Sequence, residues 1–163
     1  MQRICTTRQR SHRVPKNLQS SIDVAATPEQ VWTVVADLKR MPEWSPQCRV
    51  MQPLGTVREG TRTINVNRQG WKFWPTTAKV VRFEPNKEVA FRIVENRTIW
   101  SFELEPTAGG TKLTQRRDVP NGTSKISQLG VDKVLGGNDS FEDELVDGMN
   151  STLAKIKQAV EQG

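Results

Sequence analysis

A series of alternating strands followed by one long amphipathic helix constrains this fold more than any other feature. The chain opens with a strand, Leu18 to Ala25, and a helix that begins at Thr27, and about six strands with period-two alternation follow. From about Asp139 to Gln162, apolar residues recur every three or four positions, as on one face of a helix. Only this helix is long enough to cover the sheet. The pattern predicts an α+β fold in which a strongly bent antiparallel sheet of about seven strands grips the C-terminal helix.

A hollow is expected between the sheet and this helix, because a strongly bent sheet cannot meet a straight helix along its whole length. Such hollows are the usual sites of small-molecule binding, with volumes of about 300–1,000 Å³. Two short helices are predicted before the six-stranded meander. Thr27 and Gln30 have the spacing of a capping box, and Pro42 and Pro46 end helical order.

The net charge of +6 is concentrated at the N-terminus. Five of the 24 basic residues, and no acidic residue, lie within residues 1–16, so the rest of the chain has 19 basic residues against 18 acidic ones. We expect residues 1–16 to form a flexible basic arm and residues 17–163 to form a single domain. Because the body of the protein is nearly neutral, nucleic acid is not an expected partner.

The chain shows no sign of a membrane span or a disulfide framework. No stretch approaches about 18 consecutive apolar residues. Its two cysteines, Cys5 and Cys48, are too few and too differently placed for a set of disulfides or a metal site. We expect a reduced, cytoplasmic protein that is a monomer or a weak homodimer.

Predicted turns fix which side chains share a face of the sheet. They fall at Gln69-Gly70, Pro85-Asn86-Lys87, Glu95-Asn96 and Thr107–Gly110. Propagated from strand to strand, this register places nearly all large apolar residues on one face. Trp74 falls on the opposite face, which indicates either an exposed aromatic ring or a bulge. The ligand-binding residues expected on the apolar face and on the helix above it are Arg62, Ile64, Phe73, Thr77, Lys79, Phe91, Thr98, Trp100, Phe102, Gln115, Arg117, Leu145 and Met149.

Three cations of this set, Arg62, Lys79 and Arg117, lie on the predicted apolar face, where an unpaired charge is costly. Two interpretations remain open. The cations either lie at strand ends and reach water along their apolar stems, or they border the cavity. In the second case they favour a ligand with a carboxylate, phenolate or phosphate.

Residues suited to catalysis are sparse. His12 is the only histidine and lies in the predicted arm, and the chain has no tyrosine and no acids or cysteines at metal-ligand spacing. We therefore expect no metal and no cofactor. If a reaction is catalysed, Arg117 and Asp118 are the candidates for proton transfer. Gly136-Gly137, together with Leu135, is predicted to form a gate or hinge before the long helix.

Six segments of the chain have a recognisable order and composition: Ser21–Trp32, Ala36–Trp44, Val80–Pro85, Trp100–Pro106, Gly110–Thr114 and Gly148–Lys157. Together they resemble the START-like or SRPBCC superfamily, whose fold is called helix-grip. The last segment resembles the terminal helix of the polyketide cyclase/dehydrase-like branch, and the resemblance extends from about residue 18 to residue 161. It implies a helix-grip fold with an internal cavity. Members of the superfamily bind lipids, sterols, polyketides, plant hormones or quinones, and a few are cyclases.

Binding of an amphipathic hydrophobic small molecule, lipid-like or polyketide-like, is the function that these features favour, for transport or sequestration. One alternative is an enzyme of the polyketide cyclase or dehydratase type, acting without metal or cofactor. The other is an interaction module whose basic arm and sheet surface contact another macromolecule. The lack of histidine in the body of the chain argues against the enzyme.

Overall fold

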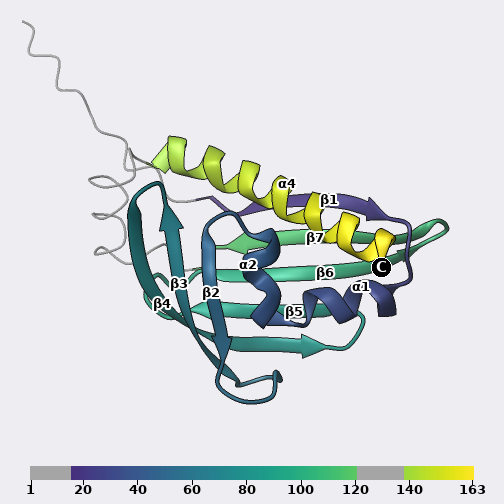
Figure 1. Cartoon of the computed structure of the whole chain (residues 1–163), viewed down its shortest axis with the longest axis horizontal. Helices are drawn as coiled ribbons and strands as arrows, with labels where there is room; N and C mark the ends of the chain where they lie inside the picture. The colour runs from purple at the N-terminus through teal and green to yellow at the C-terminus, as the bar shows by residue number, and fades with distance from the viewer. Residues whose placement is uncertain (1–15, 121–137) are drawn as a thin grey trace, which may run out of the picture.

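The computed structural model describes residues 16–120 and 138–163, which form a seven-stranded antiparallel sheet with helices packed against it (Figure 1). The strand order is β1-β7-β6-β5-β4-β3-β2, and the predicted helix-grip fold is confirmed. The strands are β1 (Leu18–Val24), β2 (Cys48–Pro53), β3 (Arg62–Gln69), β4 (Lys72–Glu84), β5 (Glu88–Ile93), β6 (Ile99–Thr107) and β7 (Gly110–Asp118). The helices are α1 (Pro28–Val35), the short 3-10 helix η1 (Leu38–Arg40), α2 (Met41–Trp44) and α4 (Asn138–Gln162).

Two predicted features fall on residues that the structure does not describe. One is the N-terminal arm, of which only Lys16 is described, and the other is the gate or hinge at Leu135, Gly136 and Gly137. Both stay predictions. At the boundary of the arm, the backbone N–H of Lys16 donates to the carboxylate of Glu142 on α4, at 3.1 Å.

The capping box that the sequence predicts at the start of α1 is present. The backbone N–H of Gln30 donates to Oγ1 of Thr27 at 3.3 Å, and the backbone N–H of Thr27 donates to Oε1 of Gln30 at 2.9 Å. Pro28 occupies the first turn, where its missing N–H leaves no bond unmade. These contacts start α1 directly after β1, so the chain turns back over the sheet.

A β-bulge in β4 determines which residues face the interior. Val80 pairs with Phe91 and Arg82 pairs with Ala90, so Val81 is an extra residue in β4. Side chains alternate between the two faces of a sheet. One extra residue therefore moves every earlier side chain of β3 and β4 to the face opposite the one that was predicted without a bulge. The predicted facing of five residues is therefore wrong. Arg62, Ile64, Phe73, Thr77 and Lys79 are exposed on the outer face of β3 and β4.

The hydrophobic core lies where α4 crosses the sheet. α4 follows β1 and reaches α1 and α2 (Figure 1). Leu153 and Ile156 of α4 are fully buried and belong to the same core cluster as Phe102 of β6 and Leu113 of β7. Burial of an aliphatic side chain of this size contributes about 1.5–3 kcal/mol. This packing fixes the C-terminal half of α4 on the sheet, while its first turns lie over the end of the sheet formed by β3 and β4.

Among the residues that the structure describes, no helix combines the length and the apolar composition needed to cross a bilayer.

Candidate functional site

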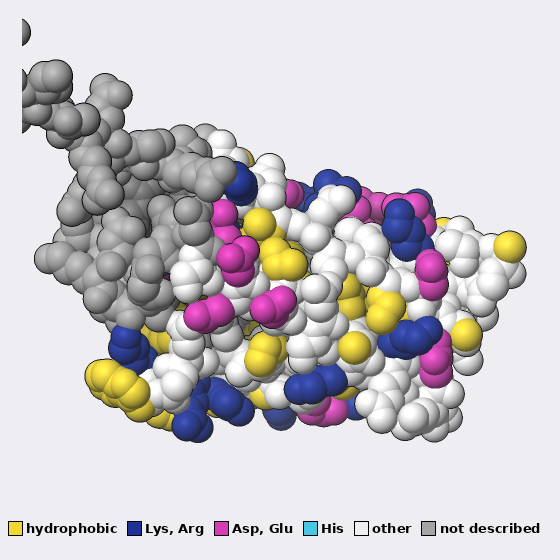
Figure 2. All heavy atoms as spheres, turned by 90° about the horizontal axis from the view of Figure 1, so that it is seen from above, with side chains coloured by type: hydrophobic (Ala, Val, Ile, Leu, Met, Phe, Trp, Pro, Cys, Tyr) yellow, Lys and Arg dark blue, Asp and Glu magenta, His cyan; other side chains and the backbone are white. Residues whose placement is uncertain are grey.

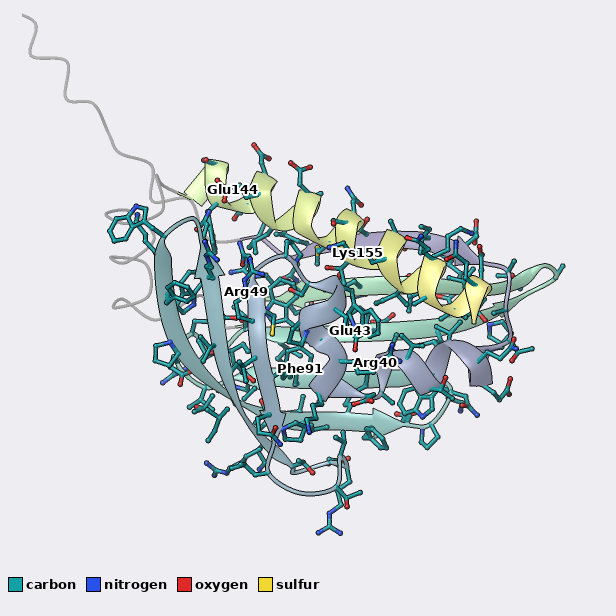
Figure 3. All side chains as sticks on the ribbon, viewed as in Figure 1. Arg40, Glu43, Arg49, Phe91, Glu144 and Lys155 are labelled. Carbon is teal, nitrogen blue, oxygen red and sulfur yellow. The ribbon has the colours of Figure 1, made fainter. Side chains whose placement is uncertain are left out.

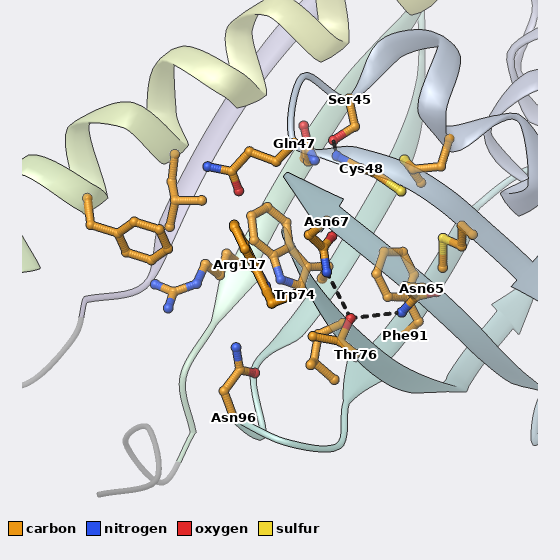
Figure 4. Close-up of a pocket in the computed structure, with 17 residues that line it drawn as sticks. Ser45, Gln47, Cys48, Asn65, Asn67, Trp74, Thr76, Phe91, Asn96 and Arg117 are labelled. Atoms are coloured by element: carbon orange, nitrogen blue, oxygen red, sulfur yellow. Dashed lines mark hydrogen bonds between the residues drawn. The ribbon is translucent and has the colours of Figure 1, made fainter. Parts of the chain in front are cut away.

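A pocket of about 150 Å³ lies between the first turns of α4, the start of β2 and the inner face of the sheet (Figure 4). Its volume is below the predicted range of about 300–1,000 Å³. Apolar and aromatic side chains form one part of its lining: Met41, Cys48, Met51, Trp74, Phe91, Ile93, Trp100, Phe141 and Leu145. The polar part consists mainly of hydroxyl and carboxamide side chains: Ser45, Gln47, Asn65, Asn67, Thr76, Asn96, Gln115 and Arg117.

Arg117 is the cation of this lining. It lies on β7, directly opposite Trp100 of β6, and only 5% of the residue is exposed. Its Nη1 atom is buried and has no hydrogen-bond partner among the described residues, and the same holds for Oε1 of Gln115, two positions earlier on the same face. Burial lowers the pKa of the guanidinium, and the carboxylate of Glu142 opposes that shift. Arginine nevertheless stays protonated in proteins. The pocket therefore contains a buried positive charge with an unused donor.

A carboxamide cluster lies across the pocket from Arg117, on the inner face of β3 and β4 (Figure 4). Oγ1 of Thr76 accepts from the Nδ2 atoms of Asn65, at 3.3 Å, and Asn67, at 3.0 Å. Oγ1 of Thr63 in turn donates to Oδ1 of Asn65 at 2.8 Å. These bonds fix the two amides before any ligand arrives, so the cluster is preorganised.

Aromatic rings separate the two polar regions. Trp74 lies beside Asn67 as its cross-strand partner, and Phe91 lies opposite Trp100. Cys48 completes this side of the wall, and burial raises the pKa of its thiol to about 11. The thiol is therefore neutral near pH 7 and acts as a small apolar group.

The predicted site residues divide into three groups. The first lines the pocket: Phe91, Trp100, Gln115, Arg117 and Leu145. The second lies on the outer face of the sheet, contrary to prediction: Arg62, Ile64, Phe73, Thr77 and Lys79. The third is buried but does not line the pocket: Thr98, Phe102 and Met149. Whether residues of the first group bind a ligand stays a prediction.

Two of these buried residues have a clear structural role. The hydroxyl of Thr98 donates to Oδ1 of Asn96 at 2.7 Å and so stabilises the turn between β5 and β6. Phe102 packs in the core. Asp118, one of the two catalytic candidates, is half-buried at the end of β7 and is not part of the pocket lining.

Sequence reasoning missed the carboxamide cluster. Thr63, Asn65 and Asn67 alternate with Arg62, Ile64 and Val66, which is the pattern of a strand with its polar side in water. The one signal against that interpretation was Trp74, a large aromatic residue on the supposedly exposed face.

The lining residues offer little for acid–base catalysis. Among the described lining residues there is no Asp, Glu, His or Tyr. In the same part of the chain, no group of three or more His, Cys, Asp and Glu side chains is placed to hold a metal ion. What the pocket can do with the residues described is to hold a ligand between aromatic rings, amide groups and one cation.

A second hollow, of about 550 Å³, lies on the surface between α1 and the end of α4. Its lining includes the solvent-exposed side chains of Glu29, Gln30 and Thr33, and none of its described lining residues has a buried polar atom without a partner. Because a binding site needs convergent polar groups in a concave surface, the inner pocket is the better candidate.

A bent sheet that grips a C-terminal helix over a mixed aromatic and polar pocket defines a helix-grip protein. The chain belongs to the family described as "Polyketide cyclase / dehydrase and lipid transport", which matches residues 16–161. No curated protein sequence matches it significantly.

Solved structures support the fold. A Polyketide_cyc-like protein from Corynebacterium glutamicum is 24% identical, with a TM-score of 0.62 over 89% of this chain and 91% of its own. The di-domain ARO/CYC StfQ from the steffimycin biosynthetic pathway is 14% identical, with a TM-score of 0.72 over 91% of this chain and 51% of its own. The KanY protein is 16% identical, with a TM-score of 0.67 over 90% of this chain and 98% of its own.

Proposed function

We propose that this protein binds a small amphipathic molecule that contains an aromatic or polyketide-like ring and an acidic group. The observation that carries the proposal is the buried guanidinium of Arg117, whose Nη1 donor has no partner among the described residues. A buried, under-satisfied cation is costly, and a carboxylate or phenolate would offset that cost through a charge-assisted hydrogen bond.

The rest of the lining supports a ring with polar substituents more than a long alkyl chain. Carboxamides on β3, held by hydrogen bonds to Thr76, face Arg117 across the pocket. A purely apolar chain would leave the Nη1 donor of Arg117 without a partner and would not use the remaining hydrogen-bonding capacity of these amides. Trp74, Phe91 and Trp100 provide flat surfaces between these polar regions. A molecule with oxygen atoms at both ends of a ring satisfies all three features.

The size of the pocket limits the enclosed part of the ligand. A cavity of about 150 Å³ holds a single six-membered ring. We therefore place one ring and its acidic group inside, with Arg117, and any further part of the ligand toward the opening.

Cyclase or dehydratase activity is the second candidate. The family description and the ARO/CYC named in one structural relative favour it. In this chain, the described lining lacks an acid or histidine to move a proton, so binding is the simpler proposal. Incubation with a reactive polyketide chain would separate the two functions, since only an enzyme changes the product distribution with turnover.

A ligand screen tests the proposal. The panel contains hydroxylated aromatic carboxylic acids, their methyl esters, fatty acids and sterols, and the readouts are tryptophan emission and the melting temperature. At a ligand concentration of a hundred times Kd, an aromatic acid should add about 2.7 kcal/mol, or roughly 5–10 °C. Stabilisation by fatty acids alone, or by esters as strongly as by acids, would refute the proposed ligand class.

A further inference from the structure

The outer face of β2, β3 and β4 carries an exposed apolar surface that the pocket does not explain. We call it the hairpin face. The exposed fractions are 82% for Trp71, 61% for Phe73, 49% for Ile64 and 45% for Val50. Val66 and Pro75 connect these side chains, because Val50 pairs with Val66 and Val66 pairs with Pro75. Figure 2 shows hydrophobic side chains beside Lys and Arg side chains at the end of the molecule where the β3–β4 hairpin lies.

A row of three cations crosses the same face. Arg62 of β3 pairs with Lys79 of β4, and Lys79 pairs with Arg92 of β5. All three side chains are exposed, and none forms an ion pair with another described residue. Like charges directly opposite each other destabilise a sheet, so a surface of negative charge would stabilise this arrangement. Thr77, two residues before Lys79 on the same face, donates its backbone N–H and its hydroxyl to the carboxylate of Glu95.

The rings of Phe73 and Trp71 each lie beside a cationic side chain. The guanidinium of Arg68 lies 5.3 Å from the ring centroid of Phe73, and the ammonium of Lys72 lies 5.6 Å from that of Trp71. Aromatic rings and long cationic side chains are the residues that gather where a bilayer meets water. Trp71 lies in the turn between β3 and β4 and is the most exposed of the four residues Trp71, Phe73, Ile64 and Val50.

We infer that the hairpin face docks on the surface of a bilayer that contains anionic lipid. Trp71 and Phe73 enter the interfacial region, and the row of Arg62, Lys79 and Arg92 contacts acidic headgroups. This inference does not depend on the ligand proposed for the pocket.

Two other occupants fit the same observations less well. A single-stranded nucleic acid needs free ring faces for stacking, whereas one side of each ring is taken by a cation and the neighbouring side chains are aliphatic. A second copy of the chain, related by two-fold symmetry, would bring the same surface against itself and so confront two rows of cations.

Docking in this way would bring the bilayer close to the pocket. The inner face of the same hairpin carries Asn67 and Trp74, which line the pocket. At the tip of the hairpin, the side chain of Gln69 donates to the carboxylate of Glu144. Glu144 lies near the start of α4 (Figure 3). A hydrophobic ligand could therefore pass between the bilayer and the pocket over a short path.

Co-sedimentation with vesicles tests the inference on the full chain. Wild type should bind vesicles of phosphatidylcholine with phosphatidylglycerol, bind pure phosphatidylcholine far less, and release at high salt. Replacing both Trp71→Ser and Phe73→Ser leaves the charge unchanged and should lower the partition coefficient by about tenfold or more. Both residues are exposed, so the melting temperature should stay the same. The single variant Trp71→Ser, in the turn between β3 and β4, should also bind the vesicles less than wild type does.

A matched pair of charge variants distinguishes binding through the hairpin face from a general effect of the protein's net charge. The double variant Arg62→Glu, Lys79→Glu should have a partition coefficient for the anionic vesicles that is lower by about tenfold or more. The control variant Lys39→Glu, Lys155→Glu makes the same change in net charge at exposed positions on η1 and α4. Its partition coefficient should fall clearly less than that of the first variant. The basic residues 1–16 are present in every variant, so they cannot cause a difference. Arg117→Met should bind vesicles as wild type does, which separates this test from the pocket.

Several results would overturn the inference. They are absence of binding to the anionic vesicles, unchanged binding by the Trp71→Ser, Phe73→Ser variant, and equal losses for the two charge variants. A dimer that Trp71→Ser disrupts, or binding of single-stranded RNA through the same residues without vesicle binding, would assign the hairpin face to another partner.

Discussion

The thiol of Cys48 lies at the wall of the pocket, where burial raises its pKa to about 11 from an ordinary value of 9.0. A raised pKa in the folded state means that folding favours the neutral thiol. The resulting stabilisation is fully present below pH 9 and is lost as the pH rises through about 11. The same burial should make this cysteine slow to react with alkylating reagents near pH 8.

We predict that the free energy of unfolding of wild type falls by about 2 kcal/mol more than that of Cys48→Ala between pH 9 and pH 11. Denaturant melts at several pH values measure this difference. The cavity left by alanine lowers the free energy of unfolding by the same amount at pH 9 and at pH 11, so it does not contribute to the difference between the two pH values. Identical pH dependence of the two proteins would show that Cys48 is solvated.

At the scale of secondary structure elements, the bulge at Val81 decides which residues form the pocket. The strands after the bulge could be predicted from their turns, because β5, β6 and β7 pair without interruption and place Phe91, Trp100 and Arg117 on one face. The strands before it could not, because a single extra residue in β4 reverses every side chain of β3 and the first part of β4. No local signal fixes a bulge, apart from a side chain such as Trp74 that falls on an unsuitable face.

Two adjacent threonines of β4 test this register. Thr76→Val removes the acceptor of both Asn65 and Asn67, and it should cost about 1–3 kcal/mol of stability because two enclosed amides lose a partner. Thr77→Val removes the hydrogen bond from the Thr77 hydroxyl to Glu95. That bond is exposed, so water can replace it, and the loss should be about 1 kcal/mol or less and smaller than that of Thr76→Val. Urea melts of the two variants give the comparison. A larger loss of stability for Thr77→Val than for Thr76→Val would support the register without a bulge, in which the carboxamide cluster does not face the pocket.

At the scale of the whole molecule, α4 holds the sheet in its bent form through the core beneath it. Leu153→Ala should lower the free energy of unfolding by about 2–5 kcal/mol, because Leu153 is fully buried where α4 crosses the sheet. Lys155→Ala, two residues further on the exposed side, is the control and should change it by about 0.5 kcal/mol or less. Similar effects of both variants in denaturant melts would mean that α4 contributes little to the core.

The N-terminal arm is expected to add little to this core. Removal of residues 1–15 should change the free energy of unfolding by less than about 2 kcal/mol, since the segment has few apolar residues to bury. The deletion keeps Lys16, whose backbone contacts Glu142, and Asn17, whose side chain accepts from the backbone N–H of Val119 at 2.8 Å. Thermal melts of the full and shortened chains make the comparison, and a larger loss would show that the arm packs on the domain.

Recognition of an acidic group by Arg117 inside the pocket can be tested by comparing two ligands and three proteins. Affinities of an aromatic carboxylic acid and of its methyl ester are measured by calorimetry for wild type, Arg117→Met and Lys79→Met. Lys79, on the outer face, is the control. We predict that Arg117→Met weakens binding of the acid by about 1.5–3 kcal/mol and barely changes binding of the ester. Lys79→Met should change neither. Equal losses for acid and ester, or no loss for either, would contradict the proposed role of Arg117.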